Sequence, residues 1–137
     1  MTTNIATANL DDFYHLVMED GNLHTIELAR RWTTATLRIT GLNMKGKARR
    51  KLAKALPEQL GSEVRRVFWL VHLHEPALPA FDFQRQVARR AGVTDGQFAR
   101  QPILAIFRQL KQIIDSELRE EVRDALPSAV GELWEQA

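Results

Sequence analysis

The stretch from Gly41 to Pro57, GLNMKGKARRKLAKALP, holds residues whose types and spacing invite phosphate chemistry. Its start nearly matches the G-x-x-x-x-G-K loop that cradles the phosphates of a nucleotide. That loop needs Ser or Thr after the lysine, to hold magnesium, and a buried strand before its first glycine. Here Ala48 follows the lysine, and a helical pattern precedes the loop. We therefore predict a turn between two helices and no nucleotide site.

A second candidate for chemistry is His72-x-His74-Glu75, which offers three metal ligands. In an extended segment the two imidazoles would point the same way. No fourth ligand can be identified, and prolines follow closely, so we expect a capping or packing role. The chain has no cysteine, which excludes disulfides and thiol catalysis, and its three serines lie in no nucleophile motif. We expect no enzymatic activity, no metal site and no cofactor.

The chain aligns with itself without a gap when it is shifted by 70 residues. Ala-Leu-Pro recurs at 55–57 and 125–127, and Asp-Phe recurs at 12–13 and 82–83. Such a match predicts two copies of one unit that share a core. We divide the chain into a flexible N-terminal tail at 1–10, repeat one at 11–70, a connector at 71–80 and repeat two at 81–137. The last three form a single helical domain.

Each copy is predicted to contain about four helices, because apolar residues recur at helical spacing and no alternating strand pattern appears. The first helices span 11–20 and 81–92 and stop at Gly21 and Gly92. The second helices span roughly 24–42 and 94–113. Thr94 is the expected N-cap of the later one, and Pro102 should kink or split it. The third helices contain 45–54 and 115–124, and the fourth begin at the prolines of Ala-Leu-Pro. The predicted fold is an all-α bundle.

The polar face of the third helix changes sign between the copies. The basic residues are Lys45, Lys47, Arg50, Lys51 and Lys54, and the acidic residues are Asp115, Glu117, Glu120, Glu121 and Asp124 at the equivalent positions. Three interpretations remain open. The faces are simply solvated; they complement each other, within the fold or between molecules; or the basic face binds a phosphate backbone, joined by Arg65 and Arg66 or by Arg30 and Arg31.

Three further features of the sequence concern residues that recur in both copies, that differ between them, or that anchor the core. Arg38 and Arg108 recur inside the second helices, where we expect half-buried salt bridges or helix caps. Threonines at 33, 34, 36 and 40 replace apolar residues of the second copy. Their helix should therefore be less fully buried, or its hydroxyls should bond back to its own backbone. The three tryptophans, Trp32, Trp69 and Trp134, are expected core anchors.

The repeated A…L…LP pattern, with Glu-Leu-Trp at 132–134 closing the second copy, resembles the prokaryotic family called domain of unknown function 2267. The resemblance covers about residues 11 to 134. It implies a small, all-helical bacterial protein and brings no catalytic or binding residue with it. The pattern of that family has acidic residues in the third helix of both copies, so the basic face at 45–54 departs from it.

Composition sets the remaining bounds. The 137 residues are 45% hydrophobic and 26% charged, a composition that is typical of one globular domain. The formal net charge of +2 does not indicate a nucleic-acid-binding protein. The longest apolar run, at 67–71, is far too short to span a membrane. We expect a cytoplasmic, non-enzymatic interaction or regulatory module that binds protein partners or itself. The contact residues are Lys45, Lys47, Arg50, Lys51, Lys54, Glu117, Glu120, Glu121 and Asp124. The alternative is a nucleic-acid-binding protein that uses the basic helix at 45–54.

Overall fold

The computed structural model describes residues 2–66 and 76–137, with side chains from residue 10 onward in the first range. Its helices are α1 (Thr2–Asp20), α2 (Ile26–Leu42), α3 (Gly46–Ala55), α4 (Glu58–Arg65), α5 (Ala80–Arg90), the 3₁₀ helix η2 (Gly96–Ala99), α6 (Arg100–Ile113), α7 (Ser116–Ala125) and α8 (Ser128–Gln136). No strand occurs in these two ranges. The all-α prediction is confirmed.

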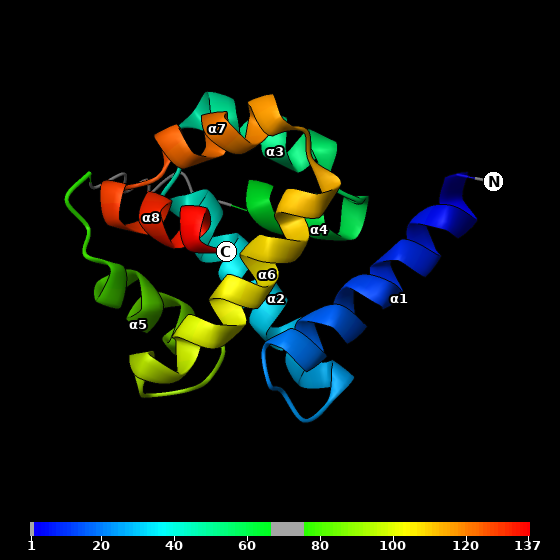
Figure 1. Ribbon diagram of the computed structural model, residues 1–137, viewed down its shortest axis with the longest axis horizontal. Helices are drawn as coiled ribbons and strands as arrows, with labels where there is room; N and C mark the ends of the chain where they lie inside the picture. Colours follow the sequence, from blue (N-terminus) through cyan, green and yellow to red (C-terminus); the bar gives the residue numbers. More distant parts are fainter. Residues whose placement is uncertain (1, 67–75) are drawn as a thin grey trace.

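Helix α1 differs from the expectation at its start. Residues 1–10 were predicted to be a tail, but α1 already begins at Thr2. The segment before Leu10 contains neither glycine nor proline, so nothing in it stops a helix that the amphipathic residues after it favour. In Figure 1 the first part of α1 stands away from the rest of the molecule.

The helix bounds of the two halves follow the 70-residue shift. Helix α3 starts and ends 70 residues before α7, and α4 starts 70 residues before α8. Buried and exposed positions also follow the shift, because residues 31–40 and 101–110 have the same sequence of burial classes. Equivalent sequence positions therefore take equivalent places in the fold.

The ends of α1 and α5 are closed by the same turn. The amide of Leu23 donates to the carbonyl of Met18 at 2.9 Å, and that of Val93 donates to Ala88 at 2.8 Å. The residues with positive φ are Asn22 (55°) and Gly92 (86°), again 70 positions apart. Gly92 stops its helix as expected, whereas Gly21 leaves this role to Asn22. Asparagine tolerates the left-handed conformation better than other residues with a side chain.

Side chains cap two of the helix starts, and one of these caps lies one residue after the predicted Thr94. Thr25 accepts the amide of Leu28 at 3.1 Å, and Asp95, not Thr94, accepts the amide of Gln97 at 3.0 Å. The predicted segment is split, but at the junction between η2, which ends at Ala99, and α6, which starts at Arg100, and not at Pro102 itself. Pro102 thus lies in the first turn of α6, where a helix needs no amide donor.

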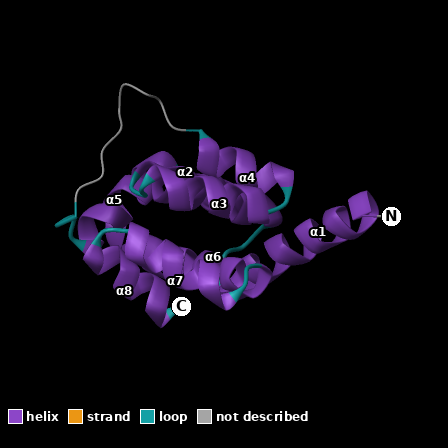
Figure 2. Ribbon diagram, turned by 90° about the horizontal axis from the view of Figure 1, so that it is seen from above, coloured by secondary structure: helices purple, strands orange, loops and turns teal. Residues whose placement is uncertain are grey.

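Helices α2 and α6 cross in the middle of the molecule (Figures 1 and 2). Helix α1 packs on both of them, α5 packs on α2, and α3 packs on α7. One core cluster takes buried residues from both halves of the chain, and within the second half the rings of Phe107 and Trp134 meet edge to face at 5.1 Å. Trp32 and Trp134 are buried as expected, and Trp69 lies outside the described residues.

Two glycines allow close approach of α4 to its neighbours. A Cβ atom on Gly41 would lie 2.2 Å from the carbonyl oxygen of Val64, and one on Gly61 would lie 2.3 Å from that of Ala53. Any side chain at these positions would force the backbones apart. Gly61 recurs as Gly131, where the carbonyl of Arg123 is 3.1 Å away, so the approach is looser in the second half.

The threonines of α2 contradict one expectation. Thr33, Thr36 and Thr40 are almost fully buried, so the helix is not more exposed than its counterpart. Their hydroxyl oxygens have no hydrogen-bond partner among the described residues, which also excludes bonds back to their own helix. The equivalent positions in α6 are Ile103, Ile106 and Leu110. Helix α2 therefore buries polar atoms where α6 buries apolar ones.

This burial predicts that Thr36→Val stabilises the protein. Valine has the shape of threonine and removes a hydroxyl whose desolvation is not repaid, so the free energy of unfolding should rise by about 1 kcal/mol. Urea unfolding followed by circular dichroism measures it. Thr25→Val is the matched control, because it removes the N-cap bond to Leu28 and should cost about 1 kcal/mol. A loss of stability in Thr36→Val would show that the hydroxyl is hydrogen-bonded.

Candidate interaction surface of helices α3 and α7

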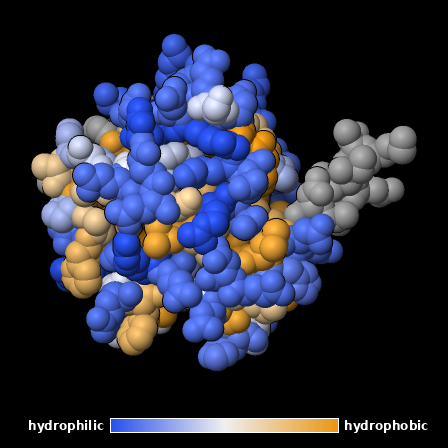
Figure 3. All heavy atoms as spheres, in the orientation of Figure 1, coloured by the Kyte–Doolittle hydropathy of each residue, from blue (hydrophilic) through white to orange (hydrophobic). Residues whose placement is uncertain are grey.

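The sequence-predicted contact residues lie on two helices that pack side by side at one end of the molecule (Figures 1 and 2). Each helix turns an apolar stripe inward: Ala48, Leu52 and Ala53 in α3, and Val122 and Ala125 in α7. The charged stripes consequently face outward, and hydrophilic residues cover this end of the molecule in Figure 3. We call this surface the α3/α7 face.

The basic half of the α3/α7 face consists of exposed side chains. Lys45 is the N-cap residue of α3, and the helix itself carries Lys47, Arg50, Lys51 and Lys54. Of these five, Lys51 alone has an ion pair within the described part of the chain. The other four ammonium and guanidinium groups are available to a partner.

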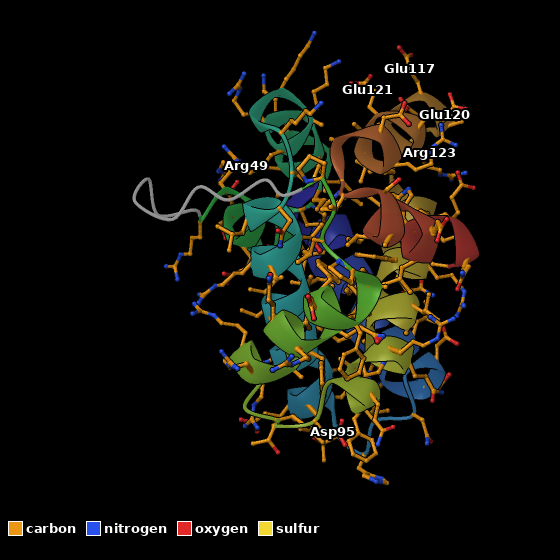
Figure 4. All side chains as sticks on the ribbon, turned by 90° about the vertical axis from the view of Figure 1, so that its left-hand side faces the viewer. Arg49, Asp95, Glu117, Glu120, Glu121 and Arg123 are labelled. Carbon is orange, nitrogen blue, oxygen red and sulfur yellow. The ribbon has the colours of Figure 1, made fainter. Side chains whose placement is uncertain are left out.

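The acidic half lies beside it on α7. Glu117, Glu120 and Asp124 are exposed, and Glu121 is partly buried. Figure 4 shows the labelled glutamates at the outer end of the molecule, next to the side chains of α3. Asp124 accepts from its neighbour Arg123 at 3.1 Å. Asp115 serves the helix itself, because its carboxylate accepts the amide of Leu118 at 2.8 Å as the N-cap.

The two halves meet at one ion pair. The Nζ atom of Lys51 lies 2.8 Å from Oε2 of Glu121, and these residues occupy equivalent positions of the two halves. The hydrogen bond to Glu121 raises the pKa of Lys51, and the charges of Glu121 and Glu117 add to the effect against some desolvation. The interpretation that the faces complement each other within the fold is thus confirmed for this pair.

Two arginines that sequence reasoning left without a role position α3 and α7. Arg49 donates to the carbonyls of Gly41 and Met44 at 3.4 Å, and Arg119 donates to that of Lys111 at 2.6 Å. Gly41 and Lys111 are equivalent, so each arginine ties its helix to the end of the preceding long helix. The signal was present in the sequence. Arg49 is the one basic residue of α3 whose counterpart is also basic.

The recurring pair Arg38 and Arg108 forms salt bridges, as expected, but with unrelated partners. Arg38 pairs with Glu63 of α4 at 2.7 Å, and both side chains are mostly buried. Arg108 pairs with Asp20 of α1, which belongs to the other half of the chain. The second bridge therefore joins the halves, whereas the first stays within one.

The remaining candidate features are a metal site and a membrane-spanning helix. His72, His74 and Glu75 lie outside the described residues. Within the described ranges, no group of three or more His, Asp or Glu side chains is placed to hold a metal ion. None of the described helices is both long and apolar enough to cross a lipid bilayer.

The Lys51–Glu121 pair yields a charge-exchange prediction. Lys51→Glu or Glu121→Lys alone places like charges together and lowers the urea midpoint, whereas the double variant restores the attraction and most of the midpoint. Lys54→Glu is the control, because Lys54 has no ion pair in the described part. Since the folded state raises the pKa of Lys51, the wild-type contribution is complete below the ordinary lysine pKa. It disappears as the pH rises through the folded-state value. Additive losses in the double variant would contradict the pair.

Comparison with known proteins supplies a family and no activity. The sequence profile of the family described as "Uncharacterized conserved protein (DUF2267)" matches residues 10–133. No curated protein matches the chain. The profile covers most of the sequence, and the helices α2 to α7 and nearly all of α1's described side chains fall within it. The chain therefore belongs to the DUF2267 family of uncharacterized conserved proteins.

Proposed function

We propose that this protein is a non-enzymatic interaction module that binds a protein partner, a second copy of itself foremost, through the α3/α7 face. The observation that carries the proposal is the juxtaposition of a basic and an acidic helix on one exposed surface, with a single ion pair between them. Positive and negative charges that lie side by side without partners in the fold favour binding of a protein with the complementary charge pattern.

The surface is also suited to recognition because it is fixed in place. Arg49 and Arg119 tie both helices to the central pair, and the apolar stripes beneath them are buried. Because the backbone of both helices is already ordered, binding has to order only their charged side chains. Within the part of the chain that the structure describes, the charged groups of this face without an ion pair are Lys45, Lys47, Arg50 and Lys54 on one side and Glu117 and Glu120 on the other.

A second copy fits this pattern by symmetry. Half a turn about an axis that runs along the seam between α3 and α7 lays the basic helix of one copy on the acidic helix of the other. The same operation lays the acidic helix on the basic one, so every attraction occurs twice, as in isologous dimers. An interface of exposed charges is weak and sensitive to salt, because water and ions screen it.

A nucleic-acid function uses the same four unpaired cations of α3. They lie on one helix face, which suits contacts to successive phosphates. The carboxylates of α7 beside them would repel a phosphate backbone, so this function ranks second.

Self-association is tested by sedimentation at about 50 mM and again at about 300 mM salt, where the Debye length falls by more than half. The expected result is a reversible dimer at low salt that dissociates at high salt. One variant, Lys47→Glu/Arg50→Glu/Lys54→Glu, makes the face mainly acidic, and another, Glu117→Lys/Glu120→Lys/Asp124→Lys, makes it mainly basic. Both leave Lys51 and Glu121 intact.

Each variant alone should be monomeric, and an equimolar mixture should form a heterodimer, because opposite faces are then restored between the two chains. Arg65→Glu/Arg66→Glu serves as the control for charge change outside the face. A wild-type protein that stays monomeric at low salt, or a mixture that does not associate, refutes self-association. If a labelled DNA strand binds to the wild-type protein and only the Lys47→Glu/Arg50→Glu/Lys54→Glu variant loses this binding, the nucleic-acid function replaces self-association.

A further inference from the structure

A second surface, separate from the α3/α7 face, lies between α2 and α5. Two adjoining clefts of about 660 Å³ each follow the contact of these helices and share Arg90 in their walls. Helices α2 and α5 lie next to one another in Figure 2. Clefts of this volume are of the size that holds ligands or the side chains of a docked segment.

The basic residues in the walls of both clefts are all arginines. Helix α2 supplies Arg30, Arg31 and Arg38, and α5 supplies Arg85, Arg89 and Arg90, against the acidic Glu27 and Asp82. Within the described chain, Arg38 is the one with a salt bridge. Arg30 lies over the ring of Tyr14 at 5.4 Å. Guanidinium groups bind carboxylates and phosphates with two parallel hydrogen bonds, which an ammonium group does not.

Comparison of the two halves shows what is missing from this site. Arg108 of the second half pairs with Asp20 of the first half. The two equivalent positions are occupied by Arg38 and Arg90, which line the same cleft and are both cationic. The neighbouring position changes in the same way, from Glu19 to Arg89. Arg38 takes its carboxylate from Glu63 instead, whereas Arg90 has no salt bridge within the described residues and remains available to an external carboxylate.

The floor of the cleft nearest α5 adds an apolar requirement. Ile39, Leu42 and the buried Leu78 line it, and an amide hydrogen bond of 3.1 Å between Asn43 and Gln86 joins α2 to α5 beside them. The stem of Arg85 is held against Gly96, where an added Cβ would lie 2.6 Å from its Cγ atom. An apolar floor stabilises an apolar side chain but contributes nothing to a phosphodiester backbone.

We infer that the two adjoining clefts, which together we call the α2/α5 groove, bind an acidic, amphipathic segment of a partner protein. Apolar side chains of that segment enter the cleft over Ile39 and Leu42, and its carboxylates pair with Arg85, Arg89 and Arg90. One of these carboxylates supplies, beside Arg90, the negative charge that Asp20 supplies at the equivalent position. The site is distinct from the α3/α7 face and does not depend on self-association.

A fluorescein-labelled helical peptide with leucines on one face and glutamates on the other tests this site by anisotropy. A peptide of 17 residues matches the length of α2, at about 1.5 Å per residue. Two matched peptides carry glutamine in place of leucine or of glutamate. The expected result is binding of the complete peptide and a loss of about tenfold or more for either control, because both kinds of contact contribute.

Variants locate the binding. Arg85→Gln/Arg89→Gln/Arg90→Gln should weaken it at least about tenfold. Lys47→Gln/Arg50→Gln/Lys54→Gln, which removes the same charge from the α3/α7 face, should leave it unchanged. Arg90→Asp should abolish it without lowering the urea midpoint, since the new carboxylate repels those of the peptide while Arg90 has no salt bridge to lose within the described residues.

Three results would overturn the inference. The complete peptide does not bind, the leucine-free peptide binds equally well, or the two triple-glutamine variants lose binding equally. A labelled single strand of DNA that binds the same arginines more tightly than the peptide would assign the groove to nucleic acid instead.

Discussion

The crossing of α2 and α6 is the contact on which the other elements depend. Helix α2 touches α1, α4 and α5, and α6 touches α1, α8 and η2, so these two helices fix the relative position of the halves. The two helices are chemically uneven. Helix α6 buries Ile103, Ile106 and Leu110, whereas α2 buries three threonines at the equivalent positions, without hydrogen-bond partners in the described chain. Burial at these positions therefore stabilises α6 more than α2.

From this centre, the same backbone positions carry opposite charges in the two halves. At α3 and α7 the opposite charges adjoin, and Lys51 meets Glu121 across the seam. At the outer helices they do not adjoin: Asp20 of α1 reaches Arg108, while its counterpart Arg90 of α5 shares a cleft with Arg38. One reversal of sign is thus partly satisfied inside the fold, and the other leaves an arginine-lined groove. The two proposed binding surfaces follow from this difference.

The sequence predicted the helices and the core because periodic apolar residues report burial directly. It left open whether the charged faces of α3 and α7 complement each other, and the structure brings them together at one ion pair, Lys51–Glu121. It could not predict that Thr33, Thr36 and Thr40 are buried, because threonine is compatible with both environments and only the tertiary contact decides. It did not predict the start of α1 at Thr2, because no glycine or proline there marks a boundary. It did not predict the roles of Asn22 and Asp95, because the adjacent Gly21 and Thr94 are equally suitable for a helix end and a helix cap.

The α2/α5 groove was invisible in the sequence for a different reason. Its arginines come from segments about 50 residues apart, and only the packing of α5 on α2 brings them together. The sequence pattern indicates Arg30 and Arg31 only as an extension of the basic helix and indicates no role for Arg85, Arg89 and Arg90. The alignment of Asp20 with Arg90 contained the signal, but its meaning required the Arg108–Asp20 bridge.

The most direct test of the central claim, that the α3/α7 face is where this protein meets its partner, is an amide NMR spectrum recorded at two protein concentrations in low salt. The account predicts concentration-dependent shifts confined to α3 and α7, which vanish when salt is added. Shifts confined to other helices, or none up to about millimolar protein, where even weak dimers associate, would contradict it.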